Sequence, residues 1–216
     1  MTFHWDIVRF SIWPLLHGAQ VTIGISVVAM LFATVVGIVL GLGSLSHFAP
    51  IRLFVSSYVF FVRGIPPLVL ILLIYFAPPA LGIDLPPFWA AVIALTVNAG
   101  AYNTEIIRAG ILAIDPGQTE AAKAIGMTWQ RTLTVVLLPQ ALRKVIPPLT
   151  NELIALIKTT PLLSVISILE LTGSGEAIVA QKFAPLEVYV LLAVFYFMLI
   201  GVLSLFMRYL ERKLAL

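Results

Sequence analysis

Lys158 is the residue whose position most strongly indicates chemistry, because it lies deep within an apolar stretch of the sequence. The preceding basic residue is about 21 Å away along a helix, so the charge falls well inside a bilayer, where it must face a cavity or a partner. In the following residues, KTTPLLS, Pro161 suits the first turn of a new helix and Thr159 or Thr160 suits its cap. A helix N-terminus beside this lysine would attract a carboxylate. The alternative is a structural kink in which Lys158 pairs with Glu152 or with a neighbouring helix.

A second polar set lies in another apolar stretch, residues 88–107. Asn98 and Glu105 are seven residues apart and therefore share a helix face, with Tyr102 between them. Glu105 would contact an amine or a cationic side chain; the alternative is an interfacial pair with Arg108, three residues further on. The residues predicted to line a path through the membrane are Asn98, Tyr102, Asn103, Glu105, Lys158, Thr159, Thr160 and Ser164.

The third candidate is a charged, helix-prone segment in residues 111–140, where residues 119–130 are rich in helix formers. Glu120 comes early in this helix and Lys123 late, as the helix dipole favours. One interpretation is a polar hairpin that links two spans. The other is a docking element, because Gly126 and its neighbouring alanines let a partner surface approach closely, and so short a helix needs packing to be stable.

Five apolar segments predict the elements that position these residues. A spanning helix needs about 20 mainly apolar residues, and the segments are 19–42, 66–81, 88–107, 145–169 and 186–210. Residues 53–62 can precede the short second segment as an interfacial or tilted helix. Strand alternation is absent, so the fold class is all-α integral membrane, a single transmembrane domain over residues 1–216 with an N-terminal interfacial segment, 1–18. Gly37 and Gly41 are expected at a helix-packing contact.

Composition excludes several other classes of protein. The chain is 61% hydrophobic and 11% charged, with a mean hydropathy of +1.07, whereas a soluble domain carries about a quarter charged residues. It has no cysteine for a disulfide or a thiolate metal site, and its three histidines show no ligand spacing. No nucleophile with a base stands in the spans, so neither a catalytic residue nor a metal site is predicted, and nucleic-acid binding is not expected.

Basic residues predict the orientation of the chain in the membrane. With the N-terminus outside, the inner loops hold ten lysines and arginines, whereas the outer loops hold Arg9 and Lys182. Positive charge accumulates on the cytoplasmic side. The C-terminus and the segment 111–140 are therefore expected in the cytoplasm.

The charged segment also resembles a family motif. Glu120-Ala121-Ala122, then Gly126, then Leu138-Pro139 look like the coupling-loop motif of bacterial ABC importer permeases. The blocks RGIPPLVLIL from Arg63, NAGAYNTEIIRAGILAIDPGQTEAA from Asn98 and NELIALIKTTPLLSVIS from Asn151 resemble the polar amino-acid uptake permeases, in the same order and spacing. The departures from the family pattern, including Thr159 where an acidic residue is common, argue against a strongly cationic substrate.

The resemblance implies a type I importer permease that works as a dimer in the bacterial cytoplasmic membrane. The residues implied to couple it to an ATPase are Glu120, Ala121, Ala122, Gly126, Leu138 and Pro139. Two ATP-binding subunits, a second permease chain and an extracytoplasmic amino-acid-binding protein are the implied partners, besides membrane lipid. The binding protein is expected to dock near residues 81–88 and the loop 170–187, which is also a candidate gate.

The resemblance implies no cofactor on this chain, with ATP and Mg²⁺ on the ATPase. The sequence contains no Gly-Lys dipeptide and therefore no P-loop. The predicted function is translocation of a polar amino acid, or a close analogue, driven by ATP hydrolysis on another chain. The alternative is a secondary transporter or channel subunit that needs no ATPase, although such proteins usually show internal repeats, and none is found here.

Overall fold

The computed structural model describes residues 4–213, and this part of the chain is helical, without strands. The elements are α1 (Trp5–Ser44), α2 (Ala49–Gly64), α3 (Pro67–Ala80), α4 (Pro87–Leu112), α5 (Pro116–Ala124), α6 (Trp129–Arg131), the π-helical segment η1 (Thr132–Leu137), α7 (Leu138–Thr159), the 3-10 segment η2 (Thr160–Ile166), α8 (Leu171–Lys182) and α9 (Pro185–Lys213). The prediction of an all-α fold is confirmed.

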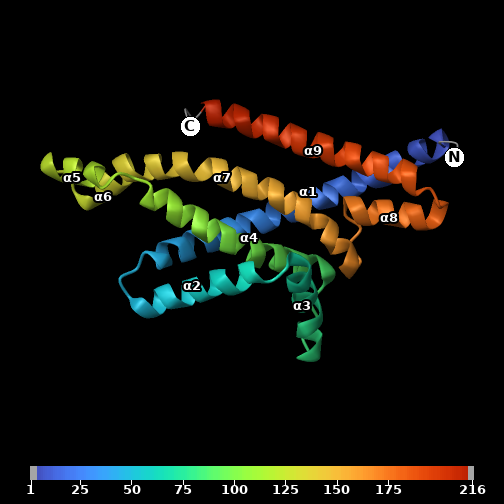
Figure 1. The fold of residues 1–216 in the computed structure, drawn as a ribbon, viewed down its shortest axis with the longest axis horizontal. Coiled ribbons are helices and arrows are strands. Elements are labelled where there is room, and N and C mark those ends of the chain that lie inside the picture. The colour runs from blue at the N-terminus through green and yellow to red at the C-terminus, as the bar shows by residue number, and fades with distance from the viewer. Residues whose placement is uncertain (1–3, 214–216) are drawn as a thin grey trace.

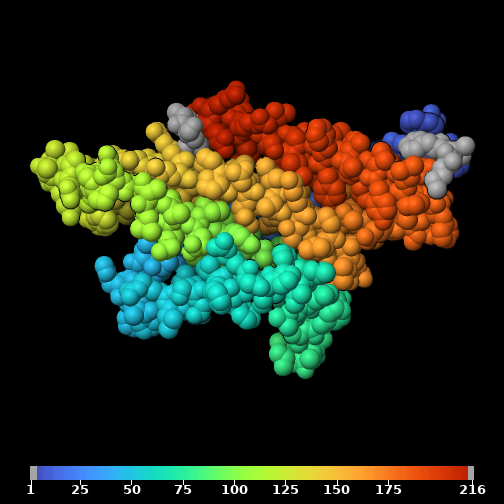
Figure 2. All heavy atoms as spheres, in the orientation of Figure 1, coloured from blue at the N-terminus to red at the C-terminus, as the bar shows by residue number. Residues whose placement is uncertain are grey.

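The long helices α1, α4, α7 and α9 run along the length of the molecule (Figure 1). The segment α5–α6 forms one end of this body, and α8 lies with the N-terminus at the other end. The helix α3 projects sideways from the body, as the space-filling view also shows (Figure 2). The molecule therefore has an elongated helical body with one lateral arm.

Length and composition identify three helices that can cross a membrane, among the residues that the structure describes. They are Trp5–Ser44, Trp129–Ile166 and Pro185–Lys213; the pair α2–α3 is a fourth candidate, bent by 105°. The helix α4 has 26 residues, but it is not among these candidates. Its polar side chains lower its mean hydropathy. Its role as a fifth span stays a prediction.

The predicted second span, residues 66–81, corresponds to α3 and is preceded by α2 over residues 53–62, as expected, but the two helices meet at a bend of 105°. The helix α3 has 14 residues, about 21 Å at 1.5 Å per residue, which is too short for a hydrocarbon layer of about 30 Å. Pro66 stands between α2 and α3 in an extended conformation (φ −57°, ψ 136°), because a proline restricts the residue before it and cannot continue a helix ladder. The chain turns sharply there instead of crossing straight.

The N-terminal boundary predicted at residue 18 is not a structural break. Residues 5–18 are the first turns of α1, which continues through Pro14 to Ser44. Residues 1–3 of the predicted interfacial segment lie outside the described residues.

The core of the molecule is the contact between α1 and α4, which small side chains on α1 bring close together. Ala29 and Ala33 are fully buried in it. A Cβ atom on Gly37 would lie 2.6 Å from the Cβ of Asn103, and one on Gly41 would lie 3.0 Å from Ile107. The predicted packing role of both glycines is confirmed.

Gly37→Ala is expected to destabilise the protein, because the added methyl group meets the Asn103 side chain and the α4 backbone. Overpacking of this kind costs about 1–3 kcal/mol, so the unfolding temperature of the purified protein in mild detergent should fall. Gly24→Ala is the matched control on the same helix, since nothing lies within 4 Å of its added Cβ. Equal unfolding temperatures for the two variants would contradict the close α1–α4 contact.

Candidate functional site

A deep pocket lies between α3, α4 and α7, with a volume of about 240 Å³. Its polar lining residues are Asn98 and Tyr102 from α4 and Glu152 and Thr159 from α7. Pro67, at the start of α3, closes one side of the pocket. Hydrogen-bonding groups and one carboxylate therefore converge on an otherwise apolar cavity, which is the usual character of a small-molecule site.

Two further hollows continue from this pocket along the same side of α4. The middle one, about 630 Å³, lies between α2 and α4 and shares Tyr102 with the deep pocket. Here the Arg63 guanidinium lies 5.0 Å from the centre of the Tyr102 ring, within cation–π range. The outer one, about 430 Å³, shares Ser56 and Glu105 with the middle one.

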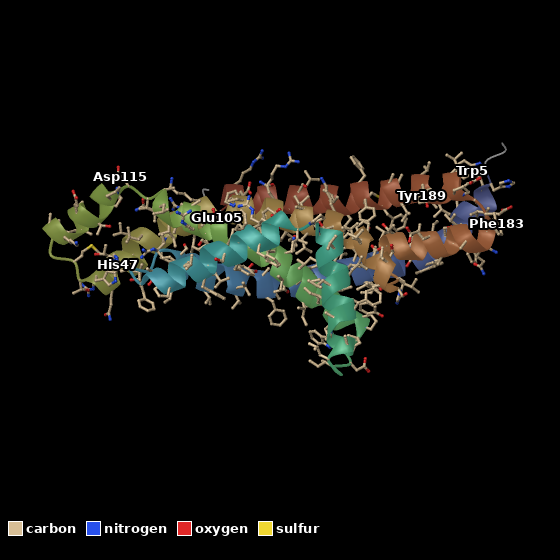
Figure 3. The ribbon with its side chains drawn as sticks, turned by 60° about the horizontal axis from the view of Figure 1, so that its bottom comes forward. Trp5, His47, Glu105, Asp115, Phe183 and Tyr189 are labelled. Atoms are coloured by element: carbon tan, nitrogen blue, oxygen red, sulfur yellow. The ribbon has the colours of Figure 1, made fainter. Side chains whose placement is uncertain are left out.

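The outer hollow carries two arginines. Arg52 donates to the backbone oxygens of Ser46 and His47 at 2.9 and 2.8 Å, and Arg108 lies 3.8 Å from the Glu105 carboxylate. Figure 3 shows Glu105 where α4 passes α2.

Together the three hollows form one polar trough along α4, with Asn98, Tyr102, Glu105 and Arg108 spaced as one helix face requires. It contains two carboxylates, Glu152 and Glu105, and the guanidinium groups of its arginines. We call this feature the α4 trough. Its lining can contact both charged ends of a small zwitterion.

Four of the eight residues predicted for a membrane path line this trough: Asn98, Tyr102, Glu105 and Thr159. Asn103 does not. It is fully buried on the opposite face of α4, where its Nδ2 lies 3.8 Å from the Met30 sulfur and its Oδ1 has no partner among the described residues. The expectation for Asn103 ignored that consecutive helix positions diverge by about 100°.

Lys158, Thr160 and Ser164 lie outside the trough as well. Lys158 is exposed, lines none of these hollows and has no ion pair with the carboxylates of residues 4–213. Thr160 is fully buried and donates to the Ile157 oxygen at 2.9 Å. Ser164 faces α8, where a Cβ on Gly173 would lie 3.4 Å from it.

The break predicted beside Lys158 is a change of helix type, since α7 ends at Thr159 and the 3-10 segment η2 begins at Thr160 with Pro161 in its first turn, as predicted. The chain continues from α7 through Pro161 into η2 without leaving helical geometry. Thr159 and Thr160 donate backwards to the oxygens of Ala155 and Ile157, at 3.0 and 2.9 Å, rather than capping a new helix. The predicted capping by these threonines is therefore not observed, whereas carboxylate binding at this position stays a prediction.

Sequence reasoning missed Arg52, Arg63 and Glu152 as site residues. The two arginines counted as loop charges, and the glutamate entered as a partner for Lys158. Arg63 immediately precedes the Gly64-Ile65-Pro66 turn, and a charge fixed beside a turn could have indicated a functional position. The local sequence does not predict which side of α4 Arg63 contacts, because that depends on how α2 folds back.

Glu170 was also missed, although it is the best-connected buried carboxylate that the structure describes. It is fully buried and accepts hydrogen bonds from Gly173 N at 2.7 Å, Tyr196 Oη at 3.1 Å and Thr22 Oγ1 at 3.3 Å. Burial raises the pKa of this carboxyl, while the hydrogen bonds lower it. The cluster joins α1, α8 and α9.

The predicted gate loop, residues 170–187, is therefore largely the helix α8, capped by Glu170 and anchored on the neighbouring helices. Short Gly-Ser sequences suggested a loop, but the buried cap organises them as a helix. No group of three or more His, Asp or Glu side chains that could hold a metal ion occurs within residues 4–213.

The charged segment forms a helical hairpin at one end of the molecule (Figure 1). Asp115 caps α5 by accepting from Gly117 N at 2.7 Å, and Gly126 turns the chain at φ +77°. The side chains of Ile125 and Trp129 are 78% and 60% exposed beside this turn. Glu120 is exposed as well, whereas Ala122 is buried. The hairpin therefore presents an apolar tip.

The arrangement has clear relatives among known proteins. The family model described as "Binding-protein-dependent transport system inner membrane component" matches residues 33–216. The L-cystine transport system permease protein TcyB of Bacillus subtilis is 42% identical over 212 residues, which are 97% of this chain and 91% of that protein. The glutamine transport system permease protein GlnP of Escherichia coli is 38% identical over 228 residues and the full length of both chains.

Solved structures agree with the described fold. An amino acid ABC transporter crystallised with histidines contains a chain with a TM-score of 0.91 and 35% identity, covering 99% of both chains. The inward-facing MetNI methionine ABC transporter has a TM-score of 0.79 at 24% identity, over 94% of this chain and 97% of that one, and supports the fold alone. The predicted importer-permease fold is confirmed.

Glu170→Leu is expected to lower the unfolding temperature in mild detergent. The substitution leaves the Thr22 hydroxyl and the Gly173 amide without their acceptor and reduces Tyr196 to its hydrogen bond with Thr172; each stranded buried group costs about 1–3 kcal/mol. The unfolding temperature should fall less for Glu170→Gln, because an amide oxygen can still accept hydrogen bonds. Glu176→Gln, at an exposed position of α8, is the control, and a loss there as large as in Glu170→Leu would refute the role of the cluster.

Proposed function

The chain belongs to the family of binding-protein-dependent transport system inner membrane components, and on that premise we propose that it translocates a polar amino acid, or a close analogue, across the bacterial cytoplasmic membrane as the permease subunit of an ATP-driven importer. The observation that carries the proposal is the α4 trough. The chain is 61% hydrophobic, and polar side chains inside a membrane cost free energy. A row of polar hollows along one helix is therefore expected to serve a polar cargo.

The charges of the trough suit a zwitterion. Glu152 in the deep pocket and Glu105 further along offer partners for an ammonium group, and Arg63 between them offers a partner for a carboxylate. Relatives named for cystine and glutamine transport support a polar amino acid as the cargo.

Energy would reach this chain through the hairpin of α5 and α6. Glu120, Ala121, Ala122 and Gly126 lie in it, and Leu138 and Pro139 follow where α7 begins. Its exposed apolar tip suits a cleft on a cytoplasmic ATPase, where ATP and Mg²⁺ would bind. Closure of two such ATPases would tilt two permease chains between inward-open and outward-open states. This placement accords with the N-terminus outside and the C-terminus in the cytoplasm.

A second permease chain would complete the site. The projecting α3 exposes Val69, Leu73 and Phe76 by 51%, 52% and 61%, and the middle hollow of the trough opens between α2 and α4. An arm of this kind is well placed to pack on a partner of similar shape. An extracytoplasmic binding protein would deliver the cargo near residues 81–88.

The alternative function is a secondary transporter or channel subunit without an ATPase. It would use the same trough, so the two functions differ in what the hairpin contacts.

Ile125→Asp is expected to abolish ATPase binding while leaving the chain folded, because it places a charge on the apolar tip of the hairpin. The tagged chain is purified from native membranes in mild detergent, and bound proteins are identified by mass spectrometry. Wild type should retain an ATPase in about equal amount. Ile83→Asp, an exposed isoleucine in the loop between α3 and α4, is the matched control. Absence of an ATPase from wild type, even after mild crosslinking, would favour the alternative function.

Glu152→Gln and Arg63→Gln are each expected to raise the amino-acid concentration for half-maximal uptake by about 10- to 100-fold, as the loss of one charge-assisted hydrogen bond predicts. The assay is uptake of a radiolabelled amino acid into proteoliposomes that hold the complete transporter. Lys158→Gln is the control, because Lys158 is exposed and lines no part of the trough. Uptake that depends on Lys158 but not on Glu152 or Arg63 would place the path elsewhere.

A further inference from the structure

An apolar groove lies between α1, α7 and α9, away from the α4 trough, with a volume of about 230 Å³. Its lining includes Ile23, Val27, Leu153, Ile157, Leu203 and Phe206. Only 6% of the most apolar window of α9 is buried, so this helix packs loosely on the body, alongside α7 (Figures 1 and 2). The described protein leaves the space between these helices unfilled.

The register of the two antiparallel helices places one cation on each at the same distance from the groove. Arg143 precedes Leu153 by ten residues on α7, and Lys213 follows Leu203 by ten residues on α9. Ten residues span about 15 Å of helix, which is half of a hydrocarbon layer of about 30 Å. If the groove lies near the middle of the bilayer, both cations lie at one of its surfaces.

Helical spacing also decides which cations face the groove. At about 100° per residue, Arg143 and Lys213 stay within roughly a quarter turn of the groove-lining face, whereas Lys144, Arg208 and Arg212 point more than about a third of a turn away. Arg143 and Lys213 are exposed, and neither has an ion pair within residues 4–213. The nearby Glu211 also turns away from the groove by about a third of a turn.

We propose that the groove holds an acyl chain of an anionic phospholipid whose phosphate group contacts Arg143 and Lys213. The apolar lining fits a hydrocarbon chain, and the two cations, which have no ion pair within residues 4–213, complement an anionic headgroup at the membrane surface. A bound chain would supply the van der Waals contacts that α9 lacks against α1 and α7. The site would thus use a lipid as a structural filler between loosely packed helices.

The test is native mass spectrometry of the full chain in mild detergent, after incubation with phosphatidylglycerol or with phosphatidylcholine of the same acyl chains. Wild type should retain one phosphatidylglycerol in preference to phosphatidylcholine. The double variant Arg143→Gln/Lys213→Gln should bind phosphatidylglycerol roughly 10- to 30-fold more weakly, as expected for two cations near an anionic headgroup. The double variant Lys144→Gln/Arg212→Gln removes the same charge from the other faces of the two helices and should bind like wild type.

Leu203→Trp provides a second measurement, because the larger side chain fills the groove without changing the charge. It should lose the retained lipid while eluting as a single species from size-exclusion chromatography. Equal losses in the two double variants, or equal retention of the two lipids by wild type, would overturn the proposal.

The competing occupant is a second copy of this chain. The chain contains no cysteine, so Val202→Cys introduces a single thiol on the groove lining. The lipid site predicts no disulfide-linked dimer after mild oxidation in membranes, and efficient crosslinking would overturn it. None of these lipid-binding and crosslinking measurements needs an ATPase or a transported substrate. A result that overturns the lipid site therefore leaves the proposed transport function untouched.

Discussion

The constraint on which the structure depends is the polarity of α4, whose polar side chains must be sheltered by other helices in a chain that is 61% hydrophobic. The glycines and alanines of α1 let the two helices approach closely, so that Asn103 and Thr104 are fully buried between them. The other polar face of α4, from Asn98 to Arg108, is then covered by α2, α3 and α7. The trough exists because these helices shelter that face without filling it.

The same helices connect the trough to the hairpin at the end of the molecule. The helix α4 ends at Leu112, and α5 begins at Pro116, four residues later; the chain returns through η1 directly into α7. Both flanking helices line the deep pocket, and Asn98 and Tyr102 of α4 and Glu152 and Thr159 of α7 are their polar contributions. The hairpin is therefore joined by short connections to both of the helices that line the pocket. The Glu170 cluster holds the opposite end by tying α8 to α1 and α9.

Individual residues show which features of the site the local sequence pattern predicts and which it does not. The spacing of Asn98, Tyr102 and Glu105 placed them on one face, and that face is the trough. Asn103 was grouped with them by polarity alone, and it lies on the buried side against α1. Lys158 was singled out by its depth, yet it is exposed and lines no part of the trough, because its position around α7 points away from α4. Spacing gives relative direction around a helix, whereas packing decides what each direction meets.

The sequence by itself determined the helical class, the approximate ends of α4 and α9, the close contact at Gly37 and Gly41, and the family motif at Glu120–Gly126. These follow from hydropathy, residue size and local spacing, which act over a few turns of chain. Only the tertiary structure decided the sharp bend at Pro66, the meeting of Arg63 with Tyr102, and the burial of Glu170 among three helices. Those features depend on contacts between segments far apart in the sequence, and no local free-energy preference specifies which distant surfaces meet.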